Sequence, residues 1–380
     1  MPDDGFLPYG RQWIDDRDIQ QVVEVLQSDF LTTGPAVARF ERALAARCDC
    51  AHAVAVSSGS AALHAVYHAA GLCPGDEIIT SPLTFAATAN AALYLGATVR
   101  FVDVEQTAGT LDPDQIEAAI SPRTRLIVPV DYAGQPADYD RINEIADHYG
   151  IDVIADASHS LGGRIGDRPV GTLATASVTS FHPVKLITTG EGGAVLTDSA
   201  DIARRAESFR SHGIELVEAD RERVGPWYTG MQVLGFNYRL SDVHSALGEA
   251  QLARLDDFVV RRAAIAGRYH EAFADLAAIE RPEVRAGVTS AWHLYVIQVR
   301  AKHRRRLFER LRQRGLGVQV HYLPVYWHPF YRDQGYGDIS CPVAEERYQR
   351  SISLPIYPRM SDHDVDRVIT VVRSALEELG

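Results

Sequence analysis

Residues 178–196, VTSFHPVKLITTGEGGAVL, place one lysine in a polar turn between two apolar runs. Val178 and Thr179 form a β-branched run that predicts a buried strand, and residues 194–196 predict a second strand after the glycine-rich turn. Lys185 therefore lies at a strand end among hydroxyl groups and glycines. A single lysine is most often a solvated surface charge. These surroundings instead favour a desolvated amine, whose pKa is lowered and which can attack a carbonyl group.

The same pattern of short apolar strands extends through the first half of the chain, with helical stretches between them. The strands are predicted at residues 53–56, 78–80, 99–102, 126–130 and 153–155, and the helices at 61–70, 86–95, 113–120 and 140–149. This alternation predicts an α/β fold with a mainly parallel sheet covered by helices on both faces. Ligands of such sheets bind at the carboxyl ends of the strands.

The ends of the chain add further elements and suggest two domains. A helix is predicted over residues 14–26, and a long helical stretch is predicted from Ser241, which we expect to be its N-cap. Further elements are expected at 294–299 and 317–320, as strands, and at 362–379, as a final helix. We expect a large domain over residues 1–245, with the N-terminal helical segment, and a small C-terminal α/β domain over residues 246–380.

Composition limits the class of protein. The 380 residues are 46% hydrophobic and 23% charged, as in an ordinary soluble enzyme, and the net charge of −12 argues against a nucleic-acid or anionic membrane surface as partner. The N-terminus has no apolar segment of a secretory signal, and no apolar run approaches the ~20 residues of a membrane helix. Cys48, Cys50, Cys73 and Cys341 form no CxxC pair, so we expect reduced thiols in a cytoplasmic protein.

Lys185 and one carboxylate suit the chemistry of pyridoxal 5′-phosphate. This cofactor requires a lysine, a carboxylate that keeps its ring nitrogen protonated, donors for its phosphate and an aromatic face for its ring. Asp156 directly follows the strand predicted at 153–155 and so lies at the ligand-binding edge of the sheet. An aspartate at such a position is about as often a turn or helix-cap residue. Its position at a strand end, like that of Lys185, favours the functional interpretation.

Further residues match the remaining requirements. The segment SSGSAA, residues 57–62, follows a strand and opens a helix, where small residues and the helix dipole suit a phosphate. Ser180 is a second candidate for a phosphate donor, and Phe85, where a loop meets a helix, is the candidate aromatic residue for the ring. Serine-glycine caps and core aromatic residues are common, so each of these features is weak without the others.

Signatures of other chemistries are absent from the sequence. We find no GxGxxG fingerprint, no Walker loop, and no HExxH or other metal-binding pattern. Of the 14 histidines, His159, His182 and His321 lie near the proposed site. The basic run over residues 302–306 resembles a patch for acidic groups, but its spacing favours a solvated helix face.

Five motifs together resemble the DegT/DnrJ/EryC1/StrS family of sugar-nucleotide aminotransferases, over essentially the whole chain. They are SDFLTTGP at 28–35, TFAATAN at 84–90, DASHS at 156–160, the SFHPVK…GEGG stretch from 180, and NYRLS at 237–241. Within the family, the segments VDYAG at 130–134 and VHYLPVY at 320–326, with His159 and His182, look most like the C4 aminotransferase of pseudaminic acid biosynthesis. Leu186 is a small departure, since that motif has proline there.

The resemblance implies the aspartate-aminotransferase type of fold (fold type I) and a homodimer whose active sites are built from both subunits. Lys185 would be the Schiff-base lysine, and Asp156 the partner of the ring nitrogen. Further cofactor contacts carried over are Phe85 on the ring, Gly59, Ser60, Ala61 and Ser180 at the phosphate, His159 beside the cofactor, and Asn237 reaching the phosphate of the neighbouring subunit's cofactor.

The implied reaction is transamination of a UDP-linked 2-acetamido-2,6-dideoxy-4-keto-hexose with L-glutamate, in which Lys185 also carries the proton. One branch of the family has histidine in place of this lysine and performs dehydration, so the lysine favours transamination. Substrate contacts are expected from Thr33, His182, Arg239, His321, Tyr322 and His328. Two alternatives are a 3- or 4-aminotransferase for a TDP- or GDP-linked sugar, and a silent cofactor-binding sensor or scaffold.

Overall fold

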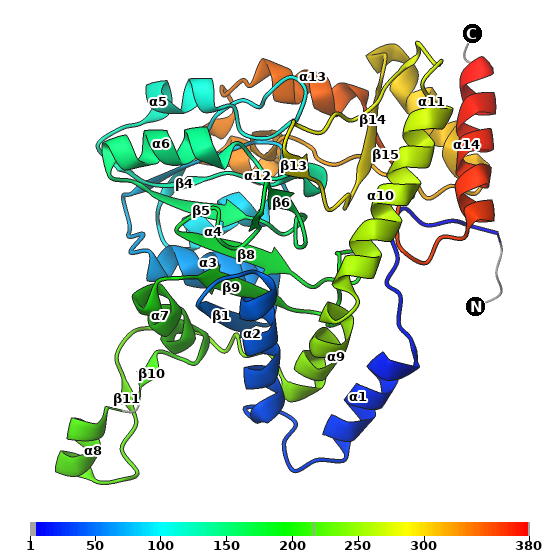
Figure 1. Ribbon diagram of the computed structural model, residues 1–380. Helices are drawn as coiled ribbons and strands as arrows, with labels where there is room; N and C mark the ends of the chain where they lie inside the picture. The colour runs from blue at the N-terminus through cyan, green and yellow to red at the C-terminus, as the bar shows by residue number, and fades with distance from the viewer. Residues whose placement is uncertain (1–4, 216, 379–380) are drawn as a thin grey trace.

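A seven-stranded sheet lies at the centre of the computed structural model, which describes residues 5–215 and 217–378 (Figure 1). The strand order is β1-β9-β8-β5-β4-β2-β3. Their bounds are His52–Val56 (β1), Glu77–Thr80 (β2), Thr98–Phe101 (β3), Thr124–Val128 (β4), Asp152–Asp156 (β5), Ala176–Ser180 (β8) and Gly193–Thr197 (β9). β9 is antiparallel to both of its neighbours, and every other neighbouring pair is parallel. The predicted α/β fold with a mainly parallel sheet is confirmed.

The strands consist of small and β-branched residues because both faces of the sheet are buried. Successive side chains of a strand point to opposite faces, and along β5 Ile154 belongs to one core cluster while Val153 and Ala155 belong to another. The helices of the first cluster are α3 (Gly59–Ala69), α4 (Ala87–Tyr94) and α7 (Ala200–Arg210). Those of the opposite face are α2 (Pro35–Arg47), α5 (Ile116–Ala119) and α6 (Tyr139–Tyr149).

A further core cluster lies in the C-terminal part of the chain. It is built on the three-stranded sheet β12-β14-β15 and on long helices beside it. The elements are β12 (Ile279–Glu280), β14 (Tyr295–Val299), β15 (Ser351–Leu354), α10 (Leu255–Ala272), α11 (Ala301–Gln313) and α14 (Asp362–Glu377). The predicted final helix is therefore present, although Leu379 lies outside the described residues. The basic run 302–306 belongs to α11, where Lys302, Arg305 and Arg306 are exposed.

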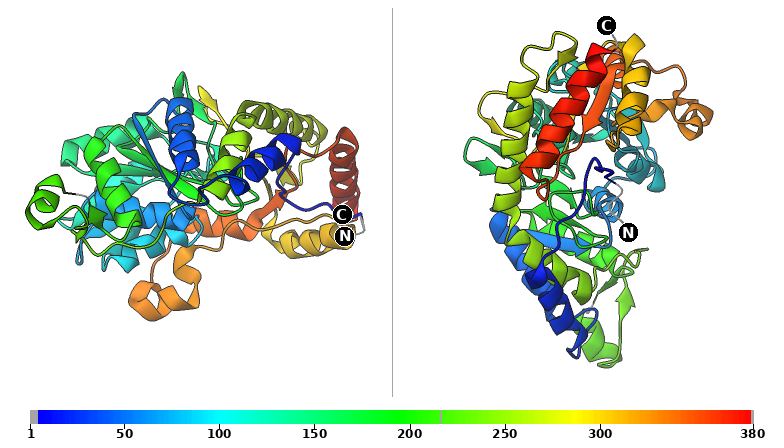
Figure 2. Two further views of the ribbon diagram at one scale, coloured as in Figure 1. Left: turned by 90° about the horizontal axis from the view of Figure 1, so that it is seen from below. Right: turned by 90° about the vertical axis from the view of Figure 1, so that its right-hand side faces the viewer.

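The remaining elements are short or lie at the N-terminus. They are α1 (Asp16–Leu26), η1 (Pro113–Gln115), η2 (Tyr132–Gly134), β6 (Arg164–Ile165), β7 (Arg168–Pro169), β10 (Ile214–Glu215), α8 (Glu218–Val224), β11 (Gly230–Met231), α9 (Asp242–Leu252), β13 (Val288–Thr289), η3 (Val325–Trp327), α12 (Pro329–Tyr331), η4 (Arg332–Tyr336) and α13 (Pro342–Arg350). β10, α8 and β11 form an arm that projects from the body in all three ribbon views (Figures 1 and 2). In the part of the chain that is described, no helix is long and apolar enough to cross a lipid bilayer.

Three of the predicted elements differ from the structure. The helix predicted at 113–120 is divided into the 3-10 turn η1 and the short helix α5. The long helix from Ser241 is capped as expected, since the Ser241 hydroxyl accepts the backbone N–H of His244 at 3.3 Å, but it is divided into α9 and α10. The strand predicted at 317–320 is wrong. The backbone of this segment forms hydrogen bonds with two different segments, from Gly317 to Leu7 and from Gln319 to Ser353. Each pairing is an isolated bridge, so no continuous strand forms.

The division into two domains stays a prediction. The boundary expected between residues 245 and 246 falls inside α9. The C-terminal half also contributes Leu294, Val325 and Tyr326 to the core cluster of the central sheet.

Phe40 tests the packing that supports the lysine-bearing loop. Its side chain is fully buried between α2 and the sheet, and its ring meets the edge of Phe181 at 5.4 Å between centroids. Because Phe181 directly precedes that loop, we expect Phe40→Ala to lower the free energy of unfolding by about 3–5 kcal/mol in denaturant titrations. Phe330→Ala, at a side chain that is 57% exposed, is the matched control and should change it by less than about 0.5 kcal/mol. Equal effects of the two changes would contradict this packing.

Candidate active site

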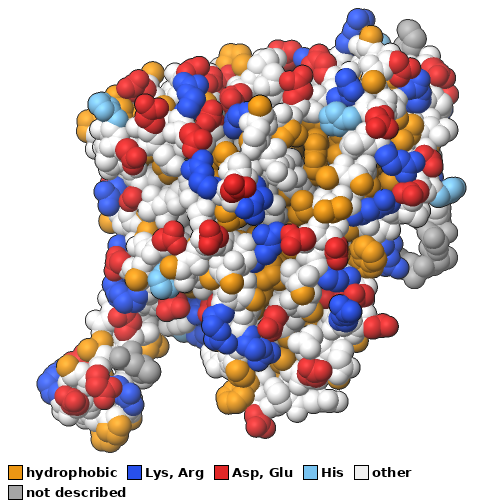
Figure 3. All heavy atoms as spheres, viewed as in Figure 1, with side chains coloured by type: hydrophobic (Ala, Val, Ile, Leu, Met, Phe, Trp, Pro, Cys, Tyr) orange, Lys and Arg blue, Asp and Glu red, His pale blue; other side chains and the backbone are white. Residues whose placement is uncertain are grey.

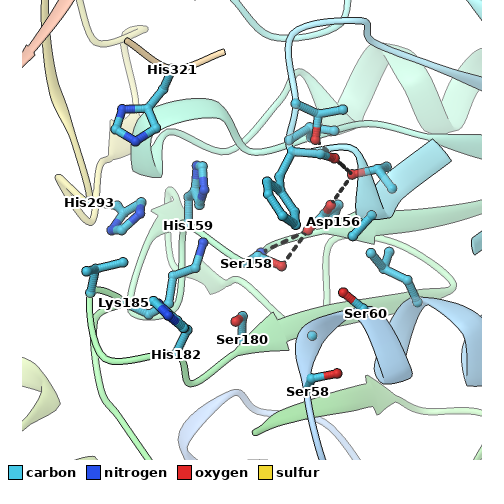
Figure 4. Close-up of a pocket in the computed structure, with 18 of the residues that line it drawn as sticks. Ser58, Ser60, Asp156, Ser158, His159, Ser180, His182, Lys185, His293 and His321 are labelled. Carbon is cyan, nitrogen blue, oxygen red and sulfur yellow. Dashed lines mark hydrogen bonds between the residues drawn. The ribbon is translucent and has the colours of Figure 1, made fainter. Parts of the chain in front are cut away.

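A cavity of about 400 Å³ opens at the carboxyl ends of β1, β2, β5 and β8 (Figure 4). This is the edge at which parallel α/β sheets bind ligands. Ten of the residues predicted for the site line it: Gly59, Ser60, Phe85, Asp156, His159, Ser180, His182, Lys185, His321 and Tyr322. Lys185, His159 and His293 lie on one side of the cavity, and Asp156 with Ser158 lies on the other.

Lys185 lies in the loop between β8 and β9, and its amine points into the cavity (Figure 4). The loop turns back on itself, since the Lys185 backbone N–H donates to the His182 carbonyl oxygen at 2.8 Å. Burial lowers the pKa of the Lys185 amine to about 8, and the charge of Asp156 opposes this shift. At pH 7 about a tenth of the amine is therefore unprotonated, and this is the form that acts as a nucleophile or a base.

Asp156 is the last residue of β5, and its side chain is almost fully buried. Oδ1 accepts the Ser158 hydroxyl at 2.6 Å and the Ser158 backbone N–H at 3.2 Å, while Oδ2 accepts the Thr88 hydroxyl at 2.6 Å. Three donors thus stabilise a carboxylate that faces the cavity, where it can hold a protonated ring nitrogen. Ser158 and Thr88 were not predicted from the sequence.

The N-terminus of α3 forms a small, polar end of the cavity. Ser58 caps the helix by accepting the Ala61 backbone N–H at 3.1 Å, and Gly59 and Ser60 line the cavity beside it. A Cβ atom on Gly59 would lie 2.9 Å from the Cβ of Ser180, so only glycine allows β8 to approach this closely. Ala61 is buried and does not line the cavity, and its predicted contact with the phosphate stays a prediction.

Three neutral histidines form one wall of the cavity. Burial, with smaller effects of the charges of Lys185 and His321, lowers the pKa of His159 well below its ordinary value. Burial likewise lowers the pKa of His293, and it lowers that of His321 to about 4. His159 Nε2 lies 3.0 Å from the Tyr322 hydroxyl, and the rings of His159 and His293 are 4.3 Å apart between centroids. In the described residues, Nδ1 of His159 is buried and has no hydrogen-bonding partner.

Besides Ala61, four predicted residues do not line this cavity. Thr33 and Asn237 are exposed, Arg239 lies beside β1 through its backbone contact with Val56, and His328 follows η3. Conversely, His293, Thr88, Ser158, Tyr9 and Glu191 line the cavity but were not among the predicted site residues. His293 carries no local signal, because it is distant in sequence from the other residues and enters the site only through the fold.

The residues present fit pyridoxal phosphate. The glycine-lined helix end suits its phosphate, and Asp156 suits its ring nitrogen. Phe85 is 64% exposed at the mouth of the cavity and lies 6.3 Å from the Tyr322 ring, so one face of it is free to cover a ligand.

Known proteins of similar sequence and structure identify the family of the chain. A model of the DegT/DnrJ/EryC1/StrS aminotransferase family matches residues 12–373. The spore coat polysaccharide biosynthesis protein SpsC of Bacillus subtilis (strain 168) is 41% identical over 379 residues, covering 98% of this chain and 97% of SpsC. Helicobacter pylori PseC, an aminotransferase involved in the biosynthesis of pseudoaminic acid, has a TM-score of 0.93 at 32% identity, covering 98% of this chain and 100% of PseC. The PLP form of Spr1654 from Streptococcus pneumoniae has a TM-score of 0.92 at 27% identity, covering 99% and 100% of the two chains.

Fold and site together define a fold type I, pyridoxal-phosphate-dependent aminotransferase. The chain belongs to the DegT/DnrJ/EryC1/StrS aminotransferase family. The predicted family, fold, class of enzyme and cofactor are confirmed, and the enzyme is a sugar aminotransferase.

The lowered pKa of Lys185 can be measured directly because the chain has only two lysines, Lys185 and Lys302. In cofactor-free protein, an amine-acylating reagent should label Lys185 with a half-maximal rate near pH 8, because the amine is protonated and unreactive below that pH. Mass spectrometry of the labelled peptides reports both sites, with Lys302, exposed on α11, as the internal reference. Identical pH profiles for the two lysines would contradict the desolvated environment of Lys185.

Proposed function

We propose that the enzyme transfers the amino group of L-glutamate to C4 of UDP-2-acetamido-2,6-dideoxy-β-L-arabino-hex-4-ulose, in a pseudaminic acid pathway. The observation that carries the aminotransferase chemistry is the Lys185 amine facing the Asp156 carboxylate across one cavity. The similarity to PseC over the whole chain supports the choice of sugar.

Each part of the cofactor has residues suited to hold it. Asp156 would hold the ring nitrogen and Phe85 would cover the ring, while His159 would lie beside it. Gly59, Ser60 and Ser180 would bind the phosphate at the N-terminus of α3. When bound, pyridoxal phosphate supplies an electron sink that acidifies a C–H bond of the substrate.

Lys185 is the residue that moves the proton. Burial lowers the pKa of its amine to about 8, so that an unprotonated amine is available. This amine would accept the proton from the α-carbon of L-glutamate and deliver it to the C4′ carbon of the cofactor. In the second half of the reaction the same amine would carry a proton in the opposite direction and deliver it to C4 of the sugar. Lys185 and not a histidine would carry this proton. The lowered pKa values of His159, His293 and His321 keep these side chains neutral.

We also propose a homodimer with shared active sites. Three large apolar side chains in and just after the projecting arm are open to solvent: Trp227 is 78%, Met231 65% and Leu234 79% exposed. Figure 3 shows hydrophobic atoms among charged side chains on the arm. Large apolar side chains exposed near one another on one segment suit a protein interface. Asn237, at the base of the arm, is exposed and outside its own chain's cavity, which suits a contact with the partner's cofactor phosphate. The four free thiols suit a cytoplasmic location.

A second candidate substrate is a different sugar nucleotide, TDP- or GDP-linked, that receives its amine at C3 or C4. The similarity to SpsC, at 41% identity over 379 residues, supports a sugar for another pathway, because the name of SpsC refers to spore coat polysaccharide biosynthesis.

Product analysis separates the two candidates. Purified enzyme with L-glutamate and a panel of UDP-, TDP- and GDP-linked keto sugars should give one amino sugar nucleotide by mass spectrometry, and we expect it from the UDP-linked 4-keto sugar. Lys185→Ala should lower the rate by at least about 10²–10⁴-fold, because the positioned base is lost. Lys302→Ala should leave the rate unchanged. Turnover of only a TDP- or GDP-linked sugar would contradict the proposed substrate.

Subunit complementation tests the shared site. Lys185→Ala and Asn237→Ala homodimers should both be weakly active, since each lacks one part of every site. After mixing and subunit exchange, mixed dimers contain one intact site, so about a quarter of wild-type activity should return for random pairing. If activity does not return although mass spectrometry detects mixed dimers, then Asn237 acts within its own chain. A fully active Asn237→Ala homodimer would show that Asn237 has no role in the site.

A further inference from the structure

We propose that Thr88 is a positioning residue, which together with Thr84 fixes the Asp156 carboxylate toward the ring nitrogen of the cofactor. The inference rests on the proposed role of Asp156 and goes beyond it, because it assigns a function to two hydroxyl groups behind the carboxylate. All three side chains are nearly or fully buried: Thr84 is 3%, Thr88 0% and Asp156 5% exposed.

The three groups form a chain of hydrogen bonds with one direction (Figure 4, dashed lines). The Thr88 hydroxyl lies 2.6 Å from Asp156 Oδ2 and 2.7 Å from the Thr84 hydroxyl. A carboxylate can only accept, so Thr88 donates its single proton to Asp156, and Thr84 must donate to Thr88. The Phe85 carbonyl oxygen, at 3.3 Å from the Thr88 hydroxyl, is the weaker acceptor. This series of hydrogen bonds therefore ends at the charged carboxylate, where hydrogen bonds are strongest.

Thr88 is itself held in place from two directions. It lies in the first turn of α4, where its backbone N–H donates to Phe85 at 3.3 Å. The hydroxyl of Tyr67, on α3, donates to the Thr88 carbonyl oxygen at 3.1 Å. Because α3 begins at the proposed phosphate site, the same helix fixes both the phosphate end of the cavity and the residue that aims Asp156.

The two oxygens of Asp156 are anchored from opposite sides. The hydroxyl of Ser158, the second residue after β5, donates to Oδ1. The hydroxyl of Thr88, in α4, donates to Oδ2. Two anchors fix the rotation of the carboxylate about its last bond, whereas one anchor leaves it free to turn. Without the Thr88 hydroxyl, Asp156 loses a hydrogen bond to its charged carboxylate in a buried site. We expect it then to bind a protonated ring nitrogen more weakly.

Cofactor binding by the dialysed, cofactor-free enzyme tests this role without any turnover. The dissociation constant is measured by fluorescence for pyridoxal phosphate and for its 1-deaza analogue, in which a carbon replaces the ring nitrogen. Both compounds carry the aldehyde and the phosphate, so contacts with Lys185 and α3 cancel in the ratio of the two constants. Any general loss of folding cancels in the same way.

The wild type should prefer pyridoxal phosphate over the analogue, and Thr88→Val should reduce this preference by about tenfold, the effect of one hydrogen bond to a charged group. Thr88→Ser, which keeps the hydroxyl, should restore it, and Thr84→Val should have a smaller effect in the same direction. Asp156→Asn is the reference, and it should largely abolish the preference.

An unchanged preference in Thr88→Val, with the preference lost in Asp156→Asn, would overturn the role of Thr88 and leave the proposed function intact. A preference retained by Asp156→Asn would overturn both, because Asp156 would not then bind the ring nitrogen. A loss in Thr88→Ser equal to that in Thr88→Val would show that the site requires the shape of threonine and not its hydroxyl, which also overturns the proposal.

Discussion

The buried carboxylate of Asp156 is the constraint on which the rest of the site depends. Removing a carboxylate from water costs several kcal/mol unless donors and an opposite charge replace the water. Thr88 and Ser158 supply the donors, and the cation must come from the cavity. The loop between β8 and β9 brings Lys185 to the same cavity, where burial lowers the pKa of its amine. The carboxylate therefore favours a ligand with a cationic ring nitrogen, because opposite charges attract. The unprotonated amine favours a ligand with a carbonyl group, with which it can react.

The sequence predicted the elements of the central sheet well, because each strand is a short run of β-branched and small residues buried on both faces. It could not give the strand order, since β9 inserts antiparallel between β8, the strand just before it in the sequence, and β1, the first strand of the chain. The wrong strand at 317–320 has the right apolar pattern. Its partners, Leu7 and Ser353, are set by tertiary packing, which a local pattern does not contain.

Site residues at strand ends could be predicted because position and chemistry agree locally, as for Asp156 at the end of β5 and Ser180 at the end of β8. His293 and Thr88 could not. His293 follows no strand of the central sheet, and Thr88 looks like an ordinary residue in the first turn of a helix. Asn237 stays a prediction, because its expected partner belongs to a second subunit.

The visible absorbance of the purified protein, after addition of pyridoxal phosphate and exhaustive dialysis and then after addition of L-glutamate, tests the central claim most directly. The account predicts a yellow band that survives dialysis in the wild type, is missing in Lys185→Ala, and fades when glutamate is added. A band that Lys185→Ala retains as firmly as the wild type, or no retained band in either protein, would contradict the assignment of the Lys185–Asp156 cavity as the cofactor site.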